Sequence, residues 1–294
     1  MRRKLVRQGD NAHTITLPAS WIKDRNLQAK DEVIIKEYED SLIISSEQKD
    51  INKSIKLTLN SDSEKYITAI LRNLYINGYD EIKIKFTSDK VFKKISEANS
   101  NLIGYELENI KDNNCIIKNY NTPSSKEYES IFKKVFYITF MIADLTKEGL
   151  TNNLDEKINQ LNKDSSKFSC YARRIIFKAN ISKEEDGITK YSIINVLHMI
   201  ARNFATINDK SNKLSNKTKQ YYDKILKDLR TVFEAYCNKN LSEINKILEE
   251  RNSTLSQAFK IKNDQEIIHY LAEISRLTGT IAGKVGFLIA TLPP

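Results

Sequence analysis

Apolar side chains alternate at intervals of four and three residues through residues 124–294, and this spacing constrains the fold more than any other feature. It places one narrow apolar seam along each helix, as in near-antiparallel helix bundles. The clearest seams are the series Leu154, Ile158, Leu161, Ser165, Phe168, Ala172, Ile175, Ala179; Ile193, Leu197, Ile200, Phe204, Ile207; and Ile267, Leu271, Ile274, Thr278, Ile281, Val285, Leu288. They predict six helices, at roughly residues 126–148, 153–179, 188–212, 216–239, 241–261 and 265–291.

The six predicted helices divide into two similar sets of three. Segments Ile194–Ile207 (INVLHMIARNFATI) and Ile268–Ile281 (IHYLAEISRLTGTI) share Leu, Ile, Arg and Ile at matching places, 74 positions apart. A duplicated three-helix unit is the economical explanation, and chance recurrence within heptads is the alternative. Ser124 and Glu127 form a capping-box pattern that predicts where the first helix begins.

Residues 53–121 show a different pattern, in which strands alternate with helices. The predicted order is strand Ser54–Leu59, helix Ser63–Ile76, strand Glu81–Phe86, helix Lys90–Ala98, then a hairpin of Leu102–Ile110 and Asn114–Tyr120. This order indicates a small α/β layer.

Residues 1–48 predict a separate β-rich module. Its elements are strands Lys4–Gln8 and His13–Leu17 about the turn Gly9-Asp10-Asn11, a helix over Ala19–Asn26 with Trp21 and Ile22 facing inward, and strands Glu32–Tyr38 and Ser41–Ser46 about Glu39-Asp40. Elements this short cannot bury much of a core alone, so we expect the module to complete its core by dimerising.

Composition limits the class of protein. No apolar run approaches the length of a membrane helix or a signal peptide, so we expect a cytoplasmic chain without membrane insertion. Cys115, Cys170 and Cys237 are widely separated and predict buried thiols rather than disulfides or zinc ligands. The three histidines lack a nearby nucleophile motif, and the eight glycines form no phosphate-binding loop, so neither an enzyme nor a cofactor is expected.

Positive charge is concentrated near the N-terminus. The net charge of +9 favours an anionic partner, although an AT-rich genome would enrich any protein in lysine. Up to residue 25, six basic residues face only Asp10 and Asp24, an excess of 6 − 2 = +4; they are Arg2, Arg3, Lys4, Arg7, Lys23 and Arg25. Together with His13 they are candidate DNA contacts, and a solvated edge strand that resists aggregation is the alternative.

The N-terminal sequence resembles the SpoVT/AbrB-like swapped-hairpin family. The matching residues are RKLVRQGDNAHTITLPASWIK, then Leu27, then KDEVIIKEYEDSLIIS. The resemblance implies a dimeric DNA-binding module in which Arg3, Lys4, Arg7 and Lys23 contact DNA. Two turn positions depart from the family pattern, since Lys30 and Ser41 stand where glycine is usual.

The helical half resembles PhoU-type regulators, which have two three-helix repeats. The segments between the two ends, AILRNLYINGYDEIKIKF and LIGYELENIKDNNCIIKNYNTP, extend the similarity. The whole chain therefore resembles archaeal phosphate uptake regulators. In that family acidic helix positions bind metal ions. The equivalent positions here are His198 and Arg202, then Ala272 and Arg276, so we expect no metal cluster. Arg202 and Arg276 are candidates for binding an anion or an acidic partner, and pairing with bundle carboxylates is the alternative.

The sequence therefore predicts an α+β multidomain chain: a swapped-hairpin module at 1–48, an α/β segment at 53–121 and a PhoU-like six-helix domain at 124–294. The first functional hypothesis is a homodimeric DNA-binding regulator of phosphate uptake, signalled through a transporter component or a sensor kinase. The alternatives are a protein-interaction adaptor without DNA binding and an antitoxin-like regulator.

Overall fold

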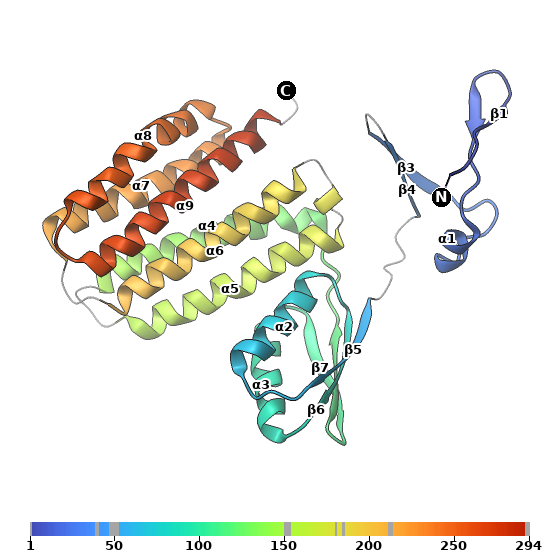
Figure 1. Cartoon of the computed structure of the whole chain (residues 1–294), viewed down its shortest axis with the longest axis horizontal. Helices are drawn as coiled ribbons and strands as arrows, with labels where there is room; N and C mark the ends of the chain where they lie inside the picture. The colour runs from blue at the N-terminus through green and yellow to red at the C-terminus, as the bar shows by residue number, and fades with distance from the viewer. Residues whose placement is uncertain are drawn as a thin grey trace. The chain divides into compact units, whose positions relative to one another are not determined.

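The computed structural model describes residues 2–38, 41–46, 53–149, 154–179, 181–183, 186–210 and 214–291. Internal contacts group the chain into two compact units, Met1–Asn52 and Lys53–Pro294. Small sheets and long helices make it an α+β protein (Figure 1), as predicted. No helix among the described residues has the length and apolar character of a membrane-spanning segment.

The N-terminal unit contains two hairpins and a short helix. Strands β1 (Val6–Gln8) and β2 (Ala12–Thr14) pair antiparallel, helix α1 (Ala19–Asp24) follows Pro18, and β3 (Val33–Tyr38) pairs with β4 (Ser41–Ser46). The predicted order is confirmed, while the turn at Glu39-Asp40 lies outside the described residues. Trp21 and Ile22 are only half-buried, because the unit encloses no core for them.

Lys30 has a backbone conformation that glycine adopts more readily than other residues. Its φ of 84° lies in the left-handed region, where a side chain crowds the backbone. The turn is therefore formed at some cost in strain.

The predicted α/β layer is confirmed in the first part of the second unit. A four-stranded sheet has the order β5 (Ser54–Leu59), β6 (Glu81–Phe86), β8 (Asn114–Asn119), β7 (Tyr105–Lys111), with β5 and β6 parallel and the other pairs antiparallel. Ile82, Ile84 and Phe86 are buried on one face, which helices α2 (Glu64–Ile76) and α3 (Asp89–Asn99) cover. Lys83 and Lys85 alternate with them on the exposed face, as the period of a strand requires.

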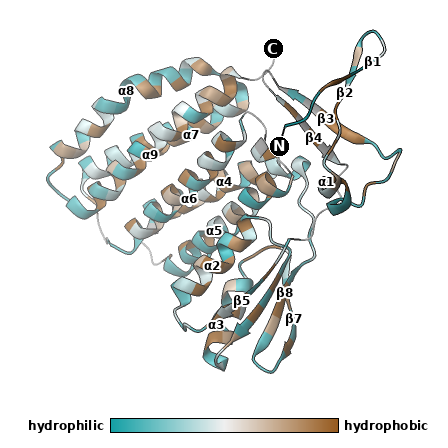
Figure 2. Cartoon of the chain, turned by 45° about the vertical axis from the view of Figure 1, so that its right-hand side comes forward, coloured by the Kyte–Doolittle hydropathy of each residue, from teal (hydrophilic) through white to brown (hydrophobic). Residues whose placement is uncertain are grey.

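Six long helices follow in the described residues, close to the predicted ranges. They are α4 (Ser125–Gly149), α5 (Asp155–Lys178), α6 (Gly187–Asn208), α7 (Asn216–Asn238), α8 (Leu241–Lys260) and α9 (Gln265–Ala290), with a 3-10 turn at Ile181–Lys183. Helices α4, α5 and α6 pack on one another, as do α7, α8 and α9, and α6 contacts α9. Apolar and polar residues share each helix (Figure 2), as amphipathic helices require.

Helix α4 begins at Ser125, directly after Ser124, as predicted, and Ser124 Oγ accepts from Lys126 N. Glu127 does not complete the capping box, because its carboxylate accepts from the hydroxyl of Tyr171 on α5. One local prediction is wrong. Cys237 is exposed, since it lies on the solvent side of the last turn of α7, whereas Cys115 and Cys170 are buried as predicted.

Candidate nucleic-acid interface

The basic residues predicted to contact DNA all lie in the N-terminal unit. Arg2, Arg3 and Lys4 precede β1, Arg7 lies in β1, His13 in β2, Lys23 in α1, and Arg25 follows the last residue of α1. All are exposed except Arg25, which is half-buried. An anionic partner can therefore contact these side chains without any rearrangement of packed residues.

The first hairpin brings Arg7 and His13 together, since they are directly opposed across β1 and β2. Arg7 Nε donates to the carbonyl of Gly9 at 3.2 Å, and its guanidinium lies 3.9 Å from the carboxylate of Asp10. Both members of this ion pair are largely exposed, so water screens the pair and a phosphate could replace the carboxylate.

Arg25 is held against the short helix. Its guanidinium stacks over the Trp21 ring at 4.6 Å, and its Nη1 lies 3.5 Å from the Trp21 carbonyl. Stacking on an aromatic face leaves the edge of a guanidinium open to an acceptor. Arg25 therefore presents a positioned cation, whereas Lys23 extends into solvent from the same helix.

Apolar side chains are also exposed in this unit. Among residues 2–35, 37, 41, 42, 44 and 46, no side chain is fully buried. Six large apolar residues are between 46% and 70% exposed, namely Leu5, Val6, Ile15, Ile34, Ile35 and Leu42. A hairpin with its apolar side chains in water is marginally stable at best. The unit therefore requires an apolar surface against it.

Arg202 and Arg276, the candidate anion-binding residues of the bundle, differ in their surroundings. Arg276 on α9 forms an exposed ion pair with Glu273, one turn earlier, at 2.8 Å. Arg202 on α6 is exposed, and no described residue forms an ion pair with it. Within the described residues, no group of three or more His, Cys, Asp or Glu side chains is gathered as a metal site requires.

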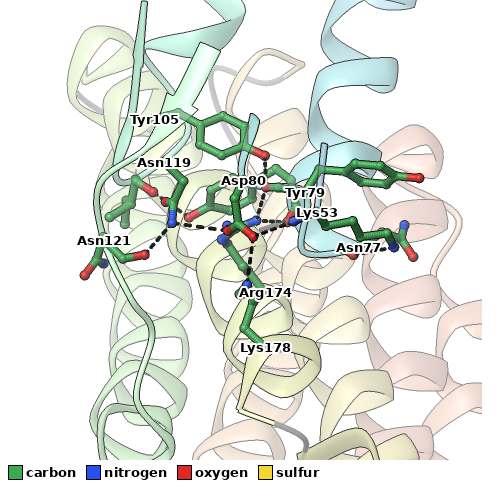
Figure 3. A network of polar contacts seen from close by, with 11 residues as sticks. Lys53, Asn77, Tyr79, Asp80, Tyr105, Asn119, Asn121, Arg174 and Lys178 are labelled. Carbon is green, nitrogen blue, oxygen red and sulfur yellow. Dashed lines mark hydrogen bonds and ion pairs between the residues drawn. The ribbon is translucent and has the colours of Figure 1, made fainter. Parts of the chain in front are cut away.

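The most extensive polar network lies elsewhere, where the α/β layer meets α5 (Figure 3). The carboxylate of Asp80, just before β6, accepts from Arg174 Nη2 at 2.7 Å and from Lys178 Nζ at 2.9 Å. Arg174 is completely buried, and its Nη1 also donates to the carbonyls of Tyr75 and Tyr79 at 2.6 and 2.9 Å. The carboxylate of Asp80 thus pairs with two cations, and both terminal nitrogens of Arg174 have acceptors, although its buried Nε has no hydrogen-bond partner among the described residues. This network fixes the layer on the bundle.

Sequence reasoning missed this network. Asp80 and Arg174 lie 94 positions apart. Asp80 lies within the segment AILRNLYINGYDEIKIKF that supports the resemblance, but that segment indicates no partner for its carboxylate. A weak signal existed, because Arg174 stands beside the apolar seam of α5, where a charged residue needs a partner.

Comparison with known proteins gives no relative: the chain matches no protein-family model, and no curated protein and no solved structure is significantly similar to it.

Proposed function

We propose that this chain is a homodimeric, non-catalytic regulator that binds DNA through its N-terminal unit. One observation carries the proposal: the unit exposes apolar and basic side chains together and buries none of its own. An assignment to phosphate uptake rests only on the resemblance of the whole chain, in its order of domains, to archaeal phosphate uptake regulators. On that resemblance, the helical half receives the signal from a transporter component or a sensor kinase.

The apolar residues support the dimer. Ile35 in β3 and Leu42 in β4 project from a two-stranded sheet that has two open edges and no covering layer among the described residues. A second copy supplies both missing parts at once, since its strands can pair with the edges and its apolar side chains can cover the faces. If hairpins from two chains pair, the six exposed apolar residues of each chain would be buried.

The basic residues support DNA as the partner. A dimer brings two copies of the +4 cluster together, which suits the regularly spaced phosphates of a duplex. The four residues that the family resemblance marks as contacts, Arg3, Lys4, Arg7 and Lys23, would give about eight phosphate contacts per dimer. The logarithm of affinity should then fall with the logarithm of salt concentration with a slope of about −7.

Fluorescence polarisation with the full-length protein and a labelled duplex of mixed sequence tests DNA binding. Arg3→Ala/Arg7→Ala removes four charges per dimer and should reduce the salt slope by about half. Lys93→Ala/Lys217→Ala, which removes two exposed lysines from the second unit, is the matched control and should leave the slope unchanged. Equal effects of both double variants would contradict the interface.

Sedimentation equilibrium tests the dimer. Ile35→Asp and Leu42→Asp place a charge on side chains that are exposed within one chain, so they should abolish both dimer and DNA binding. The second unit should remain folded, as its far-ultraviolet circular dichroism would show. A dimer that persists in both variants would refute the proposed pairing. A dimer that forms but never binds DNA would favour the adaptor alternative, whose partner affinity should depend only weakly on salt.

A further inference from the structure

Helices α5 and α6 face each other with polar side chains where the rest of their contact is apolar. Ser165, Ser169 and Arg173 are spaced four residues apart and so share one side of α5. They meet Asn195 and His198 of α6: Ser165 Oγ lies 3.4 Å from His198 Nδ1, and Arg173 Nη1 lies 3.3 Å from Asn195 Oδ1. Arg202 follows His198 by one turn of α6.

Arg173 is a buried cation that forms no ion pair with any residue that the structure describes. The residue is only 8% exposed. Its three guanidinium nitrogens donate to neutral acceptors, which are the Ser169 carbonyl at 3.1 Å, Asn195 Oδ1, and Cys170 Sγ at 3.5 Å. The next residue, Arg174, is also buried but pairs with the carboxylate of Asp80. A buried charge without a counter-ion raises the free energy of the folded protein, so a bound anion beside Arg173 would stabilise it.

Two further guanidiniums lie near the same place. Burial first, and then the positive charges of Arg173, Arg72 and Arg202, lower the pKa of His198 to about 3. The imidazole is therefore neutral at physiological pH. Arg72 on α2 is half-buried and Arg202 is exposed, and neither guanidinium has a hydrogen bond or ion pair to any described residue. Three arginines on three helices therefore lie close enough to one buried histidine for their charges to act on it.

Neutral donors accompany these charges. The Ser169 hydroxyl is fully buried and has no partner among the described residues. If Ser165 donates to His198 Nδ1, the neutral ring carries its proton on Nε2 and can donate it outward. A site with three guanidiniums, a hydroxyl and an imidazole N–H contains donors and positive charge but no carboxylate.

We infer that Arg72, Arg173 and Arg202, with Ser169 and His198, form a binding site for a small tetrahedral oxyanion: free phosphate or sulfate, or the terminal phosphate of a small molecule. The planar fork of a guanidinium matches two oxygens of such an anion. Arg202 and Arg72 reach solvent and would admit the anion, and Arg173 would contact it from within. The inference deepens the proposed function by naming the class of signal that the helical half receives, and to that extent rests on it.

Thermal unfolding and isothermal titration calorimetry of the full-length protein test the site, without DNA, so that their outcome does not depend on DNA binding. The probes are sodium phosphate, sodium sulfate and glycerol 3-phosphate, each compared with sodium chloride at equal ionic strength. Arg72→Gln and Arg202→Gln change side chains that are not buried, so the fold should persist. Each should weaken oxyanion binding by about 10- to 100-fold, the loss of one charge-assisted hydrogen-bond pair.

Arg276→Gln is the matched control, since this arginine stands at the equivalent helix position of the second repeat but already pairs with Glu273. It should bind the oxyanions as the unaltered protein does. Asn195→Asp adds the complementary test, because it places a carboxylate beside Arg173 with almost no change in shape. This variant should unfold at a higher temperature in chloride and lose most of its response to oxyanions.

Binding of phosphate and sulfate alike would support a general oxyanion site, and binding of phosphate or glycerol 3-phosphate alone would support a phosphate site. No response beyond that to chloride would overturn the inference. So would an equal loss of binding in Arg276→Gln and Arg202→Gln.

Discussion

Replacing Asp80 by asparagine should separate the α/β layer from the helix bundle more effectively than any other single change of similar size. The substitution keeps the shape of the side chain and removes its charge. It leaves Arg174, which is completely buried, without its counter-ion at 2.7 Å, and it removes the carboxylate that Lys178 contacts at 2.9 Å. The two carbonyls bound by Arg174 Nη1 remain in place.

Removing one member of a buried ion pair costs about 3–5 kcal/mol, chiefly because the other charge stays buried. Asparagine can still accept one hydrogen bond, so we expect about 3 kcal/mol for Asp80→Asn and about 4–5 kcal/mol for Asp80→Ala. Arg174→Met should cost less than Asp80→Ala, since Lys178 continues to pair with the carboxylate. Combining Asp80→Asn with Arg174→Met should then fall short of the sum of the single effects by about 2 kcal/mol.

Urea unfolding followed by far-ultraviolet circular dichroism measures these changes, because most of the helical signal comes from the second unit. Asp223→Asn is the control: Asp223 pairs with Lys147 on the surface, where both side chains are about half exposed, and its loss should matter far less. An Asp80→Asn variant that loses less than about 1 kcal/mol, or a double variant with additive effects, would refute the assignment of Asp80 as the central contact.

Three further predictions concern single positions. A Cβ at Gly187 would overlap the Ile181 carbonyl, so Gly187→Ala should lose about 1–3 kcal/mol in urea unfolding, whereas Gly283→Ala, with open space around it, should gain up to about 1 kcal/mol. Lys30→Gly should relieve the positive φ and stabilise the N-terminal unit by about 1 kcal/mol, measured by tryptophan fluorescence; no gain would show that the turn is unstrained. Cys237 should be the one thiol that a disulfide reagent labels in the native protein. Burial raises its pKa, so its labelling rate should still increase above pH 8.5 or so, and a plateau below that pH would contradict this.

Helix and strand positions followed from the sequence because each depends on a local period. The seam from Ile193 to Ile207 marks α6, and the alternation from Glu81 to Phe86 marks β6, without knowledge of what covers either face.

Charged contacts between distant segments could not be predicted in this way. The ion pair of Asp80 with Arg174 depends on how α2 and β6 dock against α5, and no periodicity specifies a partner 94 residues away. The same limit applies to Arg202. The helix repeat identified it as a notable position, but its neighbours Arg72 and Arg173 became apparent only when three helices were brought together.

Arg173 and Arg174 are adjacent on α5 but have different surroundings. The contrast distinguishes a structural arginine from one that is available to bind a ligand. One residue step turns a helix by about 100°, so Arg174 faces the α/β layer while Arg173 faces α6. The carboxylate of Asp80 supplies Arg174 with a counter-ion from within the fold. Stability alone would favour an apolar residue at position 173, because a protein with a well-packed apolar side chain is commonly as stable as one with a buried charge, or more stable. A buried arginine surrounded by neutral acceptors, with Arg72 and Arg202 nearby, is therefore better explained by a ligand that supplies the missing negative charge.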